Sequence, residues 1–141
     1  MAIPEDLDTL NESSSRSETD IAYLSYLDDI LLIVVKEDTT AVVEHMEQLL
    51  KACVELTEHK KYYCIVDVRV NAGASNGVTE YYANNPYNQY RYADAFIINT
   101  LAMRLIVNFY MSFNKPSVPT KTFSDPESAA QWINSLKQNN A

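Results

Sequence analysis

The sequence has no long apolar segment and no cluster of basic residues, and each absence argues against a class of protein. The longest apolar stretch runs from Ile30 to Val35, far below the ~20 residues that a helix needs to cross a bilayer. The N-terminus has no basic segment followed by an apolar run, so we expect neither secretion nor membrane spanning. Because no lysine and arginine stripe offers a footprint for phosphate groups, nucleic-acid binding is not expected either.

Cysteine and glycine are equally scarce, with two residues of each. Cys53 and Cys64 stand in apolar surroundings without CxxC spacing, so they are expected to be reduced thiols that behave as small hydrophobic side chains. Such thiols suit a reducing compartment, and we predict a cytoplasmic protein. Both glycines, Gly73 and Gly77, fall in one loop, which indicates a backbone with special conformational demands there.

The formal net charge of -8 belongs mainly to the first 20 residues, which carry a net charge of -5 and four serines. This composition is too polar to offset the entropy of ordering the chain. We therefore predict an acidic, serine-rich and flexible tail over residues 1–19 and a single domain over residues 20–141. The length of that domain suffices for one hydrophobic core.

Hydrophobic periodicity in the first half predicts a hairpin, a helix and a buried strand. The β-prone runs 22–27 and 30–35 flank two aspartates that suit a short turn. Apolar residues from Val42 to Leu56 recur with a helical period. Residues 62–68 form a nearly continuous apolar run, which is typical of a central strand covered on both faces.

The second half continues the alternation of helix and strand. A tyrosine-rich segment over 78–92 begins as a helix and is broken near Pro86. A buried strand is predicted over 93–98, and a helix that is apolar around most of its circumference over 101–113. Because one sheet-facing stripe needs less apolar surface than this, we predict that the chain forms a homodimer through the helix from Leu101 to Phe113.

The chain ends with a short strand over 120–123 and a last helix. Two starts are open for that helix: Ser124 caps it and Glu127 closes a capping box, or Asp125 caps it with Pro126 in the first turn. The resulting order is β-β-α-β-α-β-α-β-α. It predicts an α/β fold with a mostly parallel mixed sheet of about five strands and four helices.

This order is similar to the SpoIIAA-like fold of STAS domains, and the second half resembles a group of uncharacterised bacterial STAS-like proteins. The residues that carry the resemblance are Ala93-Asp94-Ala95, Arg104 to Phe113 with Asn108-Phe109, Lys115-Pro116, Pro119, Phe123 and Trp132-Ile133. The resemblance implies a non-enzymatic regulatory or adaptor module that binds a protein partner. STAS-like folds are also compared with CRAL-TRIO lipid carriers, so the alternative is a protein that binds a small lipophilic molecule.

In STAS regulators, a loop after the central strand carries a serine that an anti-sigma factor kinase phosphorylates. The segment 74–78 has a comparable place here, with Ser75 at the switch position, although Ala74 replaces an aspartate of the family motif. The resemblance implies a switch or partner-binding site, whose candidate residues are Ser75, Asn76, Gly77 and Thr79. The alternative is that Ser75 or Thr79 only caps the helix that follows.

Asp67 is the most unusual carboxylate, because an unpaired charge inside a buried strand is costly. It either pairs with Arg69 or Arg104, or stands at the strand end, where α/β folds gather functional groups. Tyr81 and Tyr82 belong to a tyrosine cluster that suits a pocket, an interaction surface or half-buried packing.

We find no motif for catalysis, metal binding or a cofactor, and we expect none of the three. His45 and His59 lie fourteen positions apart with no third ligand in an evident motif.

The two functions under consideration, protein binding and ligand binding, predict different structures at the sheet edge near Ser75 and the tyrosines. A closed edge favours protein docking, and an open apolar cavity favours a ligand.

Overall fold

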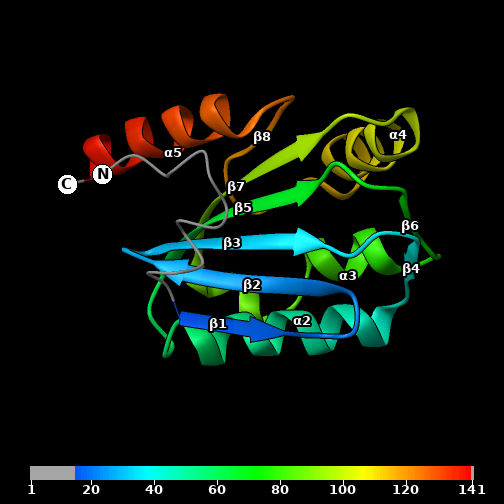
Figure 1. Cartoon of the computed structure of the whole chain (residues 1–141), viewed down its shortest axis with the longest axis horizontal. Helices are drawn as coiled ribbons and strands as arrows, with labels where there is room; N and C mark the ends of the chain where they lie inside the picture. The colour runs from blue at the N-terminus through cyan, green and yellow to red at the C-terminus, as the bar shows by residue number, and fades with distance from the viewer. Residues whose placement is uncertain (1–14, 141) are drawn as a thin grey trace.

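The computed structural model describes residues 15–140, which form a six-stranded sheet covered by helices (Figure 1). The strand order is β1-β2-β3-β5-β7-β8. β1 to β3 pair antiparallel, and β3, β5, β7 and β8 pair parallel. This confirms the predicted mostly parallel mixed sheet. The bounds are β1 Ser15–Glu18, β2 Ala22–Leu27, β3 Ile30–Val35, β5 Tyr62–Val68, β7 Arg91–Ile98 and β8 Thr120–Phe123.

Within residues 15–140, four α-helices accompany the sheet, as predicted. They are α2 Val43–Leu56, α3 Val78–Ala83, α4 Leu101–Phe109 and α5 Pro126–Asn140. Core residues of α2, α3 and α4 pack on one face of the sheet, whereas those of α5 pack on the other (Figure 1). A 3-10 helix, η1 (Pro86–Tyr90), follows α3 at the expected break, and a π-helix, η2 (Tyr110–Asn114), continues α4.

The alternation of side chains along β5 builds both halves of the core. All seven residues of this strand are buried. Cys64 and Val66 belong to the cluster beneath α2, α3 and α4, whereas Tyr63 and Ile65 belong to the cluster beneath α5. The continuous apolar run of the sequence is therefore the signature of a strand that has no solvent-facing side.

Three strands occur where the sequence predicted none. The first, β1, overlaps the predicted flexible tail: residues 15–18 pair with β2, so ordered structure begins before residue 20. The rest of that tail, residues 1–14, lies outside the described residues. The others, β4 (Thr39–Ala41) and β6 (Ala72–Ala74), form a separate two-stranded parallel sheet.

Side-chain hydrogen bonds at the N-caps show where helices α4 and α5 begin. Thr100 Oγ1 accepts a hydrogen bond from the Met103 amide at 3.2 Å at the start of α4. For α5, Asp125 rather than Ser124 is the cap, because its Oδ1 accepts from the Ser128 amide at 2.8 Å. Each cap satisfies a backbone N–H that the first turn of the helix leaves without a partner.

We expect Ile133→Ala to lower the free energy of unfolding by about 2–5 kcal/mol, because Ile133 is fully buried between α5 and the sheet and its truncation leaves a cavity. Chemical denaturation followed by circular dichroism measures the loss. Gln131→Ala, an exposed position on the same helix, should change the value by less than about 0.5 kcal/mol. Equal effects of the two substitutions would show that α5 is not docked as described.

Candidate functional site

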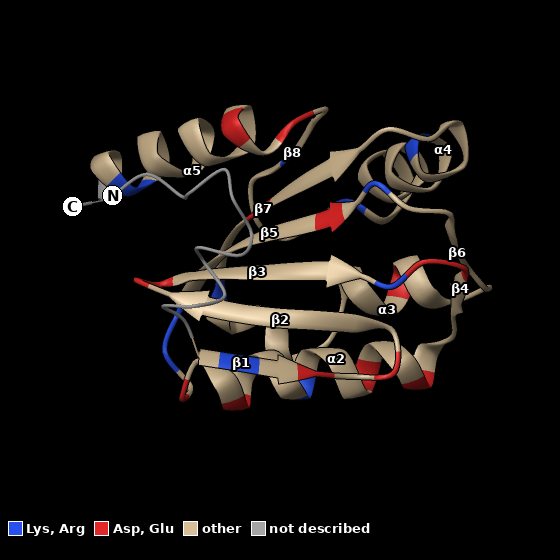
Figure 2. Ribbon diagram, viewed as in Figure 1, with Lys and Arg blue, Asp and Glu red and all other residues tan. Residues whose placement is uncertain are grey.

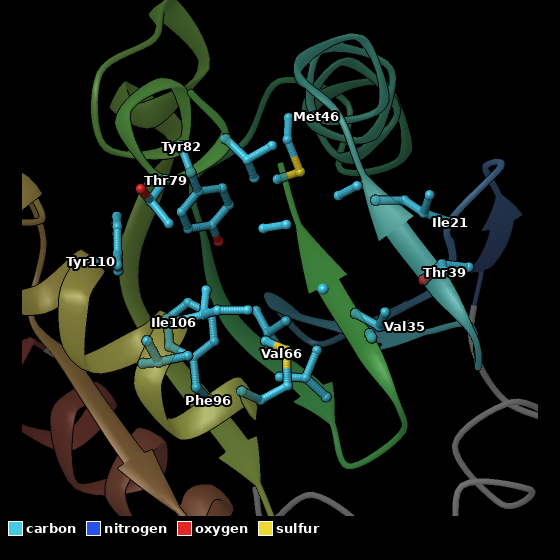
Figure 3. A pocket seen from close by; sticks show the side chains of 18 of the residues that line it. Ile21, Val35, Thr39, Met46, Val66, Thr79, Tyr82, Phe96, Ile106 and Tyr110 are labelled. Atoms are coloured by element: carbon cyan, nitrogen blue, oxygen red, sulfur yellow. The ribbon is translucent and has the colours of Figure 1, made fainter. Parts of the chain in front are cut away.

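An apolar cavity of about 110 Å³ lies between the sheet and helices α2, α3 and α4. Figure 3 shows the side chains around it, among them Met46 from α2, Tyr82 from α3 and Ile106 from α4. Val66 and Phe96 contribute the floor from β5 and β7. Among the residues that the structure describes, no histidine, cysteine, lysine, arginine, aspartate or glutamate lines the cavity. A space of this character takes up apolar groups and offers no side chain for acid–base chemistry.

One end of the cavity is bounded by the small β4–β6 sheet. Ala41 of β4 and all three residues of β6, Ala72, Gly73 and Ala74, line it. These side chains are too short to fill the space that the surrounding helices leave. The wall at this end is thus built mostly from alanine and glycine, together with Thr39 of β4.

The Ser75 loop and helix α4 enclose a second, surface hollow of about 440 Å³. All four predicted switch or partner-binding residues line it: Ser75, Asn76, Gly77 and Thr79. Leu105, Ile106 and Phe109 of α4 and Asn114 of η2 form the opposite side. The structure thus brings the predicted loop together with the apolar helix, two segments that the sequence analysis treated separately.

The cap at the start of α3 is Gly77, and no side chain makes a cap hydrogen bond there. The alternative in which Ser75 or Thr79 only caps the helix is therefore wrong. Gly77 has φ 88°, and an added Cβ would approach Val43 Cγ2 at 3.3 Å, so glycine is required for the turn. Gly73 has no such demand, because its added Cβ would meet only Thr40 Oγ1 at 3.8 Å. Ser75 itself is exposed and accessible.

Asp67 pairs with Arg69, one of the two partners considered. Arg69 Nη2 donates to Asp67 Oδ2 at 2.8 Å, and Nε donates to Oδ1 at 3.0 Å. This two-pronged contact satisfies a carboxylate that is 6% exposed. Arg104 instead lies exposed on α4, and neither arginine lines the cavity or the hollow.

Tyr81 and Tyr82 separate in the structure. Tyr82 is buried and lines the cavity, whereas Tyr81 is partly buried and packs against the core without lining either space. Tyr82 Oη donates to Asp94 Oδ1 at 3.4 Å, and the Arg91 guanidinium lies 4.2 Å from the centre of its ring. Tyr82 therefore joins the cavity wall to a buried polar cluster.

That cluster centres on Arg91 and Asp94, which are 3% and 0% exposed. Arg91 Nε lies 3.6 Å from Asp94 Oδ2, and Arg91 Nη2 donates to Asn88 Oδ1 at 2.8 Å. Burial raises the pKa of Asp94 above its ordinary value, and the charge of Arg91 opposes that rise. The sequence analysis missed the pair, although an acid inside a buried strand is the same signal that singled out Asp67.

Both thiols are buried in the core. Burial raises the pKa of Cys53 to about 12 and that of Cys64 well above its ordinary value. They are therefore protonated at neutral pH and poor nucleophiles. Among residues 15–140, no group of three histidine, cysteine, aspartate or glutamate residues is placed to hold a metal ion.

An exposed apolar stripe runs along α4 and η2 beside the hollow. Its members are spaced four residues apart: Leu101, Leu105, Phe109 and Phe113, which are 71%, 61%, 50% and 72% exposed. The rings of Phe109 and Phe113 stack with 4.8 Å between centroids. Within the described part of the chain, no helix is both long and apolar enough to span a membrane.

The comparisons with known proteins agree with this fold. The profile of one family, a domain of unknown function (DUF7793), matches residues 23–137. Among solved structures, the chain is similar to an uncharacterised protein of the DUF3478 family from Shewanella loihica PV-4, which has a SpoIIAA-like fold. The two chains are 13% identical with a TM-score of 0.51, over 86% of this chain and 92% of the other. This likeness confirms the expected SpoIIAA-like fold. No curated protein matches the chain.

We expect Asp94→Ala to destabilise the protein by about 3–5 kcal/mol, because it leaves the Arg91 charge buried without its partner. The double variant Arg91→Met/Asp94→Ala should cost less than the sum of the two single changes by about 1–3 kcal/mol. Denaturant unfolding of the four proteins measures this coupling. The exposed pair of Lys36 and Glu18 is the matched control and should show little coupling. Strict additivity at Arg91 and Asp94 would contradict the pairing.

Proposed function

The chain belongs to the family of the domain of unknown function DUF7793, and we propose that it is a non-enzymatic cytoplasmic protein that binds a small lipophilic ligand. The observation that carries this proposal is the apolar cavity beneath the β4–β6 sheet. The sequence left open whether this sheet edge is closed or encloses a cavity. The cavity favours the ligand over a protein partner as the primary function.

The size of the cavity supports a ligand, because protein interiors contain few voids larger than a water molecule. At roughly 24 cal/mol per Å³, filling about 110 Å³ with apolar groups is worth about 2–3 kcal/mol. That is a large share of a total stability of about 5–15 kcal/mol. A ligand that restores contacts with the lining recovers this free energy and stabilises the folded state by mass action.

The lining also supports binding over catalysis. Its only ionisable side chains are Tyr82 and Tyr110, and burial raises the pKa of each above its ordinary value. Both phenols are therefore neutral at physiological pH, and neither is poised as a general base.

We expect native mass spectrometry of the freshly purified full-length protein to show an adduct of low mass. Ala72→Leu should abolish the adduct, because the longer side chain extends from the wall into the cavity. Ala102→Leu makes the same change at an exposed position that lines neither space and should leave the adduct in place. Thermal melts confirm that both variants fold. A wild-type mass without adduct under gentle ionisation would contradict the proposal.

A second candidate function, protein binding, is supported by the exposed stripe of α4 and η2. We propose that its occupant is a second copy of this chain. Residues four apart form ridges that interdigitate when the same ridges meet across a two-fold axis. The sequence of α4 contains one charged residue, Arg104, and most of the helix is tan in Figure 2. Two copies of this face therefore meet without a series of opposed like charges.

The switch role of Ser75 fits the same surface and stays a prediction. Ser75 lines the hollow of which Leu105 and Phe109 form the other side. A phosphate would add about -1.5 to -2 charges at the margin of the stripe. Repulsion and desolvation would then weaken docking without disturbing the fold. A protein partner other than a second copy would bind to the same surface, and a phosphate on Ser75 would weaken its binding in the same way.

We expect sedimentation velocity of the full-length protein to show a monomer–dimer equilibrium. Phe109→Glu should shift it to monomer, because the substitution places a charge in the middle of the stripe. Gln131→Glu introduces the same charge at an exposed position of α5, on the other face of the sheet, and should leave the equilibrium unchanged. A wild-type protein that stays strictly monomeric at its highest soluble concentration would rule out the second copy as occupant.

A further inference from the structure

We infer that the ligand is a small amphiphile, whose alkyl end lies in the cavity and whose uncharged polar head group lies in the hollow beside Ser75. The inference rests on the proposed ligand-binding function and names the chemistry of the ligand. It treats the cavity and the hollow as the two halves of one site.

The two spaces adjoin. Ala74, Thr79 and Ile106 line both of them. In Figure 3 the oxygen of Thr79 is turned away from the centre of the cavity. A molecule that passes these three residues thus moves from an apolar lining to one with hydroxyl and amide groups. A ligand with one apolar and one polar end matches that change.

The volume of the cavity sets the length of the apolar end. A dry apolar cavity of about 150 Å³ accepts benzene, and the present one, at about 110 Å³, is somewhat smaller. An alkyl group of about four to six carbon atoms is of that size. A long acyl chain exceeds the space, so the ligand is not an ordinary membrane lipid held by its full chain.

The lining of the hollow sets the chemistry of the head group. Its polar residues are Ser75, Asn76, Thr79, Glu80 and Asn114, and no lysine or arginine among residues 15–140 lines it. An anionic head would lose water without gaining a cation, and the Glu80 carboxylate would repel it. Glu80 is exposed, so it compensates only weakly for the dehydration of a cationic head. An uncharged head group therefore enters the hollow at the smallest cost in desolvation free energy.

A primary amide or an alcohol is an uncharged head group of this kind, because its hydrogen-bonding atoms match the hydroxyl and amide groups of Ser75, Asn76 and Thr79.

The methyl groups of the methionine residues report whether a small molecule enters the cavity. Of the four methionines in the chain, Met46 and Met103 line the cavity, whereas Met111 lines neither space. The full-length protein labelled at its methionine methyl groups with carbon-13 is titrated with pentanamide, pentanoate and pentylammonium, which have five carbon atoms each and differ in head-group charge. Benzene is the purely apolar probe.

We expect pentanamide and benzene to shift the signals of Met46 and Met103 saturably, with little change at Met111. Pentanoate and pentylammonium should each bind at least about tenfold more weakly than pentanamide, a difference of about 1.4 kcal/mol. If neither benzene nor pentanamide shifts the two signals, the ligand-binding function itself fails. If benzene and all three head groups bind alike, or a charged one binds tightest, the cavity binds ligands but the inferred head group is wrong.

Discussion

The complete burial of β5 is the constraint on which the rest of the structure depends. A strand with no solvent-facing side needs a hydrophobic layer on each face, and here α2, α3 and α4 provide one and α5 the other. Polar groups in such a strand must find partners within the protein. Asp67 does so through Arg69, at the carboxyl end of the strand.

The same constraint explains the buried cluster on the neighbouring strand. Asp94 and Arg91 of β7 are almost fully enclosed, and Tyr82 connects them to the cavity wall. A buried ion pair seldom adds net stability, because desolvation offsets much of the attraction. Its role here is geometric: the guanidinium and carboxylate hold the Tyr82 ring in place, so the wall between α3 and the sheet has a fixed shape.

The elements with strong periodicity could be predicted from the sequence, and those defined by tertiary pairing could not. The apolar run 62–68 and the helical spacing from Val42 to Leu56 specified their own structures. By contrast, β6 has the sequence Ala-Gly-Ala, which has low strand propensity, and it forms only because Thr39–Ala41 pairs with it. Likewise, β1 is polar and serine-rich and depends on the edge of β2.

The candidate site, like the fold, could be predicted from the sequence only in part. Resemblance to a family motif singled out the loop with Ser75, and that loop lines the hollow. No pattern in the chain showed that α4 faces it across the hollow, because that placement results from how α3 and α4 follow adjacent strands. The cavity could not be predicted at all, since an empty volume depends on the distances between helices and not on the type of any one residue.

The β4–β6 sheet has a consequence for how proteins of this family diverge. Residues 72–74 line the cavity but belong to none of the six strands of the main sheet. Side chains at these positions can therefore become larger or smaller over evolutionary time while the register of the central sheet is preserved. A single scaffold can in this way give rise to relatives with spaces of different capacity, or with none, through changes confined to three successive codons.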